Sequence, residues 1–194
     1  LSFMLLGLPT LARYLLRSPR RPPVKRLVAG EAFYWISLAA LATFHWQATV
    51  TVFVIPLFLI RFLMMAGNWG QHSFVDTTDP LNAYRNSITC IDSRYNRRCF
   101  NDGYHIGHHL DPQMHWSELP VAFEAQRQEY AKQGAIVFKH VDFFMVWAML
   151  MVRAYGTLAS LFVDLQEPPR PKEEIIALLK SRARRPAGGA AQSA

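Results

Sequence analysis

Two long apolar blocks dominate the first half of the chain. Residues 27–44 contain one charged side chain, Glu31, and residues 48–67 contain one, Arg61. As a helix rising about 1.5 Å per residue, each block would extend about 27 to 30 Å, the thickness of the hydrocarbon core of a bilayer. Only residues 45–47 separate the blocks. The pattern predicts a tight transmembrane helical hairpin, which a small soluble domain could hardly cover.

The chain after the hairpin alternates between polar and apolar stretches. Residues 68–135 are mostly polar, which predicts a cap of short helices and loops. Residues 136–165 become apolar again, but Lys139, Asp142 and Arg153 interrupt them. An uncompensated charge inside a bilayer is costly. We therefore expect a helix that lies in the membrane interface or against the hairpin, and not a further span.

The two ends of the chain complete the predicted organisation. Residues 1–26 combine an apolar start with a basic, proline-rich run, which indicates an interfacial helix, or the end of an earlier span, followed by a basic connector. Residues 166–194 form a basic tail, in which residues 172–185 have the pattern of a short amphipathic helix. The predicted fold class is all-α: an integral membrane helical hairpin over residues 27–67 with a helical cap over residues 68–135.

The charge distribution orients this hairpin. The chain of 194 residues is 51% hydrophobic and carries a formal net charge of +7. Lys and Arg residues cluster on both flanks, in residues 13–26 and 85–98, and none lies in the turn at residues 45–47. By the positive-inside rule both flanks are cytosolic, so the cap is a cytosolic helical cap. Basic residues that flank membrane segments favour contact with anionic lipids over binding of nucleic acid.

Histidines gather in the predicted cap. His105, His108 and His109 form an HxxHH cluster. If residues 104–110 are helical, these side chains share one face, because positions i, i+3 and i+4 lie within an arc of roughly 100°. Asn68 and His72 have the spacing i, i+4 just after the second apolar block. We expect the two stripes to face one another and to hold a metal at the membrane surface.

At these residues the chain resembles the membrane fatty acid desaturase and hydroxylase superfamily, whose members carry three histidine boxes around two irons. The run Tyr104-His105-Ile106-Gly107-His108-His109 resembles the third box, and Asn68-Trp69-Gly70-Gln71-His72 resembles the Asn-xxx-His element after the last membrane hairpin. The family's first two boxes precede that hairpin, whereas residues 1–44 contain no histidine. We expect either the C-terminal part of a longer desaturase, with the missing boxes upstream, or an incomplete and inactive copy.

The resemblance implies a cofactor and a chemistry. Two non-heme iron ions would use O2 to introduce a double bond into an acyl chain, or to hydroxylate a lipid in the alternative activity of the same superfamily. The implied metal ligands are His72, His105, His108 and His109, with Asn68 acting through a water molecule. Neutral imidazole suits iron among other transition metals. A hydrogen bond to the second nitrogen of an imidazole would orient the ring, and the candidates for it are Asp102, Asn101 and Asp111.

The implied partners and location follow from the same resemblance. The substrate would be an acyl lipid or acyl thioester, and electrons would come from a donor such as cytochrome b5 or ferredoxin. The basic residues Arg94, Arg97 and Arg98 would bind lipid headgroups or an acidic electron donor, or simply form a solvated loop. The membrane would be the endoplasmic reticulum in a eukaryote or the inner membrane in a bacterium.

The remaining histidines and two rival functions stay open. His115 follows a helix-breaking Pro112 and is expected at the surface or beside the metal ligands. His140 is a lesser metal candidate, and His45 is expected in the far membrane interface. A membrane protein that is metal-free or binds zinc would also explain HxxHH, because zinc takes histidine ligands. A heme protein would need only two axial histidines, so three in one turn argue against it.

Overall fold

A long apolar helical run begins the described part of the protein. The computed structural model describes residues 11, 13–15, 17 and 24–183. Two compact units are present, Leu1–Met65 and Ala66–Ala194. The predicted helix at the start of the chain falls largely outside the described residues, and the predicted small-residue end of the tail falls wholly outside them.

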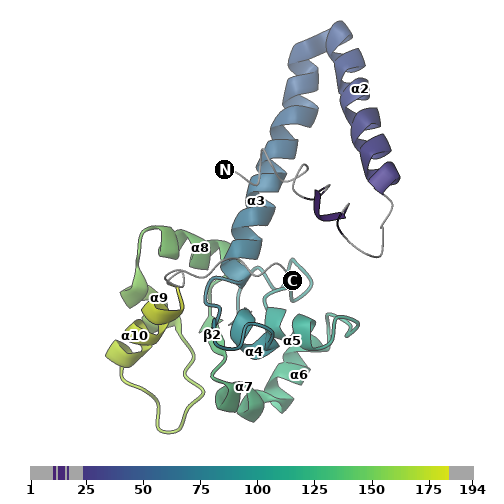
Figure 1. The fold of residues 1–194 in the computed structure, drawn as a ribbon. Coiled ribbons are helices and arrows are strands. Elements are labelled where there is room, and N and C mark those ends of the chain that lie inside the picture. The colour runs from purple at the N-terminus through teal and green to yellow at the C-terminus, as the bar shows by residue number, and fades with distance from the viewer. Residues whose placement is uncertain (1–10, 12, 16, 18–23, 184–194) are drawn as a thin grey trace. The chain divides into compact units, whose positions relative to one another are not determined.

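Three consecutive helical elements make up the apolar run: α2 (Val24–Thr49), the π-helical η1 (Val50–Val54) and α3 (Ile55–Gln71). The backbone leaves helical geometry at His45, with φ −150° and ψ 81°, and the run changes direction near this point (Figure 1). This break falls within the predicted turn at residues 45–47. Threonine hydroxyls compensate part of the disturbed backbone bonding, since Thr49 Oγ1 donates to the His45 carbonyl at 3.0 Å.

The apolar run has the properties of a membrane helix. Within the described residues, Lys25–Gln71 is the one helical run long and apolar enough to cross a membrane by length and composition. Its large side chains are strongly exposed, with 76% exposure at Phe33, 80% at Phe44 and 68% at Met64. Contiguous exposed apolar surface of this kind is typical of a membrane or partner interface. The number of passes that the run makes stays a prediction.

The second unit contains nine labelled elements after the end of α3, among residues 66–183. They are α4 (Ala83–Asn86), β1 (Ile88–Ile91), α5 (His105–Leu110), α6 (Leu119–Ala125), α7 (Arg127–Gln133), β2 (Ile136–Lys139), α8 (Phe143–Met151), α9 (Tyr155–Leu161) and α10 (Lys172–Arg182). Helices predominate, as predicted. The short helix expected over residues 172–185 is α10, which ends three residues earlier.

The all-α prediction missed a small sheet. Strands β1 and β2 pair in parallel, with Ile88 opposite Ile136 and Ile91 opposite Lys139. A parallel pair requires a long crossover connection, and α5, α6 and α7 lie in that connection. Each strand is only four residues long, and a short apolar run cannot be distinguished from a buried helical segment by its periodicity.

The prediction of a single helix over residues 136–165 was wrong. The segment contains β2, α8 and α9 instead. Asp142 caps α8, because its carboxylate accepts a hydrogen bond from the Met145 backbone N–H at 2.9 Å. Arg153 has a left-handed backbone (φ 56°) and separates α8 from α9. The charges that interrupt the apolar pattern therefore mark the ends of elements. The association of this segment with a membrane stays a prediction.

The sheet separates two hydrophobic clusters. Ile88, Cys90, Ile136 and Phe138 join side chains of α8, α9 and α10 in one cluster. The alternating residues Ile91 and Val137 join side chains of α5, α6 and α7 in the other. Successive side chains of a strand point to opposite faces, so the two clusters cover opposite faces of the sheet. The second unit is thus built as helices on both sides of two buried strands.

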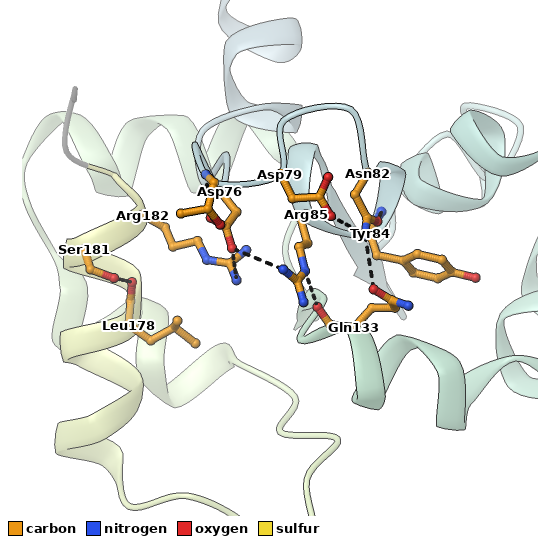
Figure 2. A network of polar contacts seen from close by, with 10 residues as sticks. Asp76, Asp79, Asn82, Tyr84, Arg85, Gln133, Leu178, Ser181 and Arg182 are labelled. Carbon is orange, nitrogen blue, oxygen red and sulfur yellow. Dashed lines mark hydrogen bonds and ion pairs between the residues drawn. The ribbon is translucent and has the colours of Figure 1, made fainter. Parts of the chain in front are cut away.

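A polar network fastens α10 to the rest of the second unit (Figure 2). Arg182 Nη2 lies 3.1 Å from Asp76 Oδ2, and Arg85 Nη1 lies 3.9 Å from the same oxygen. Arg85 also donates through Nε to the Gln133 carbonyl at 3.1 Å, which connects α4 to the end of α7. Hydrogen bonds from the Thr78 side chain and backbone, followed by the charges of Arg182 and Arg85, hold the pKa of Asp76 below its usual value despite an opposing effect of burial.

Candidate metal centre

Helix α5 begins where the chain makes a close approach to β1. The Cys90 N–H donates to the Gly103 carbonyl at 2.7 Å, while Asn96 Nδ2 donates to the Cys90 carbonyl and Asn96 Oδ1 accepts from the Gly103 N–H. A Cβ at Gly103 would overlap both Asn96 Oδ1 and the Cys90 carbonyl oxygen. Glycine at position 103 therefore allows α5 to start beside β1.

The buried side of α5 fixes which way its histidines face. Ile106 is fully buried and packs in the cluster that includes Leu119 and Tyr130, and Gly107 faces Leu119. His105 is itself buried, with 8% exposure. Its ring packs edge-on against the Phe143 ring at 5.8 Å between centroids. One turn later on the helix, His109 lies above His105, as the i, i+4 spacing predicts.

The end of α3 brings His72 to the same place. The helix ends at Gln71, and the His72 N–H continues its hydrogen-bond pattern by donating to the Asn68 carbonyl at 3.2 Å. Gly70 lies against the Phe143 backbone carbonyl, where a Cβ would overlap the oxygen. This close approach of α3 to α8 positions the turn that carries His72.

Three imidazoles converge. His105 Nε2 lies 3.3 Å from His72 Nε2 and 3.1 Å from His109 Nε2. The ring centroids of His72 and His109 are 5.1 Å apart. One ligand atom from each histidine lies within 4.8 Å of the other two, which is a separation that a single metal ion can bridge. The three side chains come from two segments, so the cluster is a product of the tertiary structure.

The hydrogen bond on the far side of His72 sets its tautomer. His72 Nδ1 lies 2.7 Å from the Asn86 carbonyl oxygen. A carbonyl oxygen only accepts, so Nδ1 carries the proton and Nε2 presents its lone pair to the cluster when the ring is neutral. Metal-bound histidines commonly donate their second N–H to a carbonyl in this way. His105 Nδ1 is buried and has no hydrogen-bond partner among the described residues.

Burial and the neighbouring imidazoles favour the neutral form of His105 and His109. Burial, followed by the nearby His109, His72 and His108, lowers the pKa of His105 to about 3. Burial, His72 and His108 also lower the pKa of His109. Both rings are therefore neutral at physiological pH and can donate a nitrogen lone pair to a metal.

Two of the five predicted ligands lie beside the cluster and not in it. His108 is exposed, and its ring stacks on that of His105 at 5.9 Å between centroids. Asn68 is exposed, and its backbone carbonyl accepts the His72 N–H. The structure thus brings together His72, His105 and His109, and the ligand roles of all five residues stay predictions.

The three residues predicted to orient an imidazole form hydrogen bonds to other groups among the described residues. Asp102 Oδ2 accepts from Gln71 Nε2 at 3.2 Å and from the Tyr95 hydroxyl at 3.1 Å, which joins the end of α3 to the loop before α5. Burial raises the pKa of Asp102 in spite of the Tyr95 hydrogen bond and the His108 charge. Asn101 donates to the Trp116 carbonyl, and Asp111 accepts from the Gln113 N–H.

The partner that sequence reasoning missed is the Asn86 carbonyl. Every residue has a backbone carbonyl, so no residue type could have indicated this one. His115 is exposed, as expected, and its Nδ1 lies 2.7 Å from Ser117 Oγ. His140 is exposed with φ 63° and lies outside the three-histidine cluster.

Comparison with known protein families shows to which family this chain belongs. A family model described as fatty acid desaturase matches residues 2–141, which include the apolar run and all three clustered histidines. The chain belongs to the fatty acid desaturase family. No curated protein and no solved structure gives a significant match.

The iron that the desaturase family implies fits the donor set of this chain. The contact of His72 Nδ1 with the Asn86 carbonyl turns Nε2 toward the cluster, and burial favours the neutral form of the His105 imidazole. Neutral imidazole is a suitable ligand for iron, and also for zinc, copper and nickel. The three clustered histidines could hold one ion, and a second ion would need further donors.

Proposed function

We propose that this desaturase-family chain is the C-terminal part of a membrane acyl-lipid desaturase. In this proposal His72, His105 and His109 bind iron directly, with His108 as a further ligand and Asn68 acting through a water molecule. The observation that carries the proposal is the convergence of three Nε2 atoms from α3 and α5, at 3.3 Å and 3.1 Å. The family relationship favours iron over the other metals that imidazole accepts.

The bound irons would supply activation of O2 and removal of hydrogen from an unactivated methylene of an acyl chain. The contribution of this chain is to position and shield the ligands. The Asn86 carbonyl orients His72 through its Nδ1 proton. Phe143 covers one side of the buried His105 ring and excludes water there. These two contacts make the ligand positions largely independent of the metal.

The membrane arrangement in this proposal explains how both reactants reach the centre. The apolar run would form a two-pass hairpin with its turn at His45 and with both flanks in the cytosol, as the distribution of Lys and Arg predicts. The acyl chain would then enter from the bilayer. Electrons would arrive from a cytosolic or membrane-tethered donor such as cytochrome b5 or ferredoxin. Hydroxylation of a lipid by the same centre is the alternative outcome.

A zinc-binding protein is the second candidate, because three converging imidazoles with one accessible side also suit Zn²⁺. His109 provides that accessible side, since it is exposed whereas His105 is buried. This candidate leaves the apolar run without a role in the chemistry.

Metal analysis and an optical spectrum distinguish these functions. The full chain would be purified in detergent without added metal and assayed for iron and zinc. Non-heme iron supports the desaturase centre, zinc without iron supports the second candidate, and a Soret band would instead identify heme. His115→Ala is the matched control, because His115 is an exposed histidine outside the cluster and its loss should leave the metal content unchanged.

A further inference from the structure

A pocket of about 630 Å³ lies in the second unit. Its lining residues are Trp69, Leu150, Arg153, Tyr155, Lys180 and Ala183. Helix α8 connects this pocket with the histidine cluster. Phe143 at its start packs against His105, and Leu150, seven residues further, lines the pocket about 10 Å away along the helix axis. The pocket is therefore a site separate from the metal centre.

The pocket offers two positive charges to a ligand. Arg153 and Lys180 are both exposed, and neither forms an ion pair with any residue that the structure describes. Arg182, on the same helix as Lys180, is instead directed to Asp76 (Figure 2). The Lys180 ammonium lies over the Tyr155 ring at 5.8 Å, which favours a fixed position for the charge. The residues that line the pocket include no Asp or Glu, so its two cations are available to a ligand that carries negative charge.

Arg153 lies in a turn whose backbone conformation suits glycine. Arg153 has φ 56°, in the left-handed region that glycine adopts most readily. Hydrogen bonds from the Arg153 N–H to Leu150 and from the Ala154 N–H to Met149 hold this conformation. A glycine would satisfy the turn with less strain.

The apolar surroundings favour a lipid over a soluble anion. Trp69 is half-exposed in the last turn of α3, the end of the helical run that is long enough to cross a membrane. Tryptophan prefers the headgroup level of a bilayer. Met151 and Val152 lie between Leu150 and Arg153 and are 52% and 75% exposed. Two cations beside exposed apolar side chains match a phosphate group that is joined to acyl chains.

We propose that this pocket binds the phosphate group of an anionic phospholipid, with Arg153 and Lys180 paired to the lipid's negative charge. The proposal rests on the membrane placement of α3 in the proposed function, but not on the metal. The bound lipid would anchor the α8–α9 turn and α10 at the membrane surface beside the end of α3.

The test measures lipid binding to the full chain in a nonionic detergent. Short-chain phosphatidylglycerol, phosphatidylcholine and inorganic phosphate are titrated separately by calorimetry. We expect one phosphatidylglycerol per chain and much weaker binding of the other two probes. Arg153→Gly and Lys180→Gln should each weaken phosphatidylglycerol binding about fivefold, the effect of one cation near a lipid surface. Lys139→Gln, an exposed lysine outside the pocket, should leave the affinity unchanged.

Glycine is the replacement for Arg153 because it should not impair folding. Arg153→Gly suits the left-handed backbone, so its thermal unfolding temperature should equal or exceed that of the unaltered chain. Equal binding of phosphatidylglycerol and phosphatidylcholine would overturn the preference for an anionic lipid. Tight binding of inorganic phosphate alone would assign the pocket to a soluble anion, and wild-type affinity in both variants would eliminate it as the site. Iron content of the same preparations tests the proposed function separately, because neither variant touches a histidine.

Discussion

His72 and His105 are 33 residues apart in the chain, yet their Nε2 atoms are 3.3 Å apart. One follows the end of α3 and the other begins α5, on opposite sides of the loop that contains β1. The Asn86 carbonyl contacts His72 Nδ1, on the side of the ring away from the cluster, and Phe143 packs against His105. Their meeting converts two short sequence motifs into one candidate metal centre.

The first prediction concerns the histidine from outside the HxxHH cluster. His72→Ala should lower iron affinity by at least the roughly 10- to 100-fold that loss of a supporting group typically costs. His105→Ala and His109→Ala should have effects of similar size, because all three nitrogens converge. Competition with a chelator measures the affinity. If His72→Ala bound iron as tightly as the His115→Ala control, the three-histidine centre would be wrong.

A second prediction concerns the contact between α3 and α8. Gly70→Ala places a Cβ against the Phe143 backbone carbonyl, which cannot move aside as a flexible side chain can. We expect the free energy of unfolding to fall by about 1 to 3 kcal/mol. Iron affinity should fall as well, since His72 is two residues away.

The control for that substitution is another helical glycine in the second unit. Gly156→Ala in α9 has no atom within 4 Å of the added Cβ. It should leave stability unchanged or raise it by up to about 1 kcal/mol. Thermal unfolding of both variants makes the comparison, and equal stability of the two would contradict the close approach of α3 to α8.

The third prediction is a pH dependence at Asp164. Burial alone raises the pKa of this carboxyl, but hydrogen bonds from the Arg170 side chain and from the backbone N–H groups of Arg170 and Gln166 lower it below its usual 3.8. The ion pair therefore contributes stability above pH 3.8, and this contribution is lost as the pH falls through the lower folded-state pKa.

Asp164→Asn should accordingly lower the free energy of unfolding by about 1.5 to 3 kcal/mol near neutral pH, the typical range for hydrogen bonds to a charged group. The difference from the unaltered chain should shrink in acid. Unfolding measured across the pH range tests this. Glu124→Gln is the comparison, because its pair with Arg127 is largely exposed and should matter little at any pH. A pH-independent effect of Asp164→Asn would show that the charge is not its cause.

The fourth prediction is topological. Gln47 lies in the predicted turn between the apolar blocks, and Gln113 is exposed shortly after α5. Single cysteines at these two positions, in a background with Cys90→Ala and Cys99→Ser, should react with an impermeant thiol reagent from opposite sides of sealed vesicles. Reaction of both from one side would mean that the apolar run does not cross the membrane twice.

Local patterns in the sequence predicted several elements correctly. Spacing and apolar content indicated the helical run, the break near His45 and the helix that carries HxxHH, because each depends on residues that are close in the chain. The strands were not predicted, because Ile88–Ile91 and Ile136–Lys139 are too short to show a period and pair with a segment that is distant in the chain. The division of residues 136–165 into three elements was missed, because the sequence pattern does not distinguish a charge within a helix from a charge at its end. In the structure Asp142 caps the start of α8, and Arg153 separates α8 from α9.

The sequence by itself determined which residue type is the candidate metal ligand, the helical spacing of His105 and His109, and membership of a helix-rich membrane family. Only the tertiary structure decided that His72 meets them while His108 lies aside, that a backbone carbonyl sets the His72 tautomer, and that Arg153 and Lys180 share a pocket. The reason is physical. Helical spacing follows from bonds between residues three or four positions apart, whereas a site built from separate elements depends on how their buried faces pack.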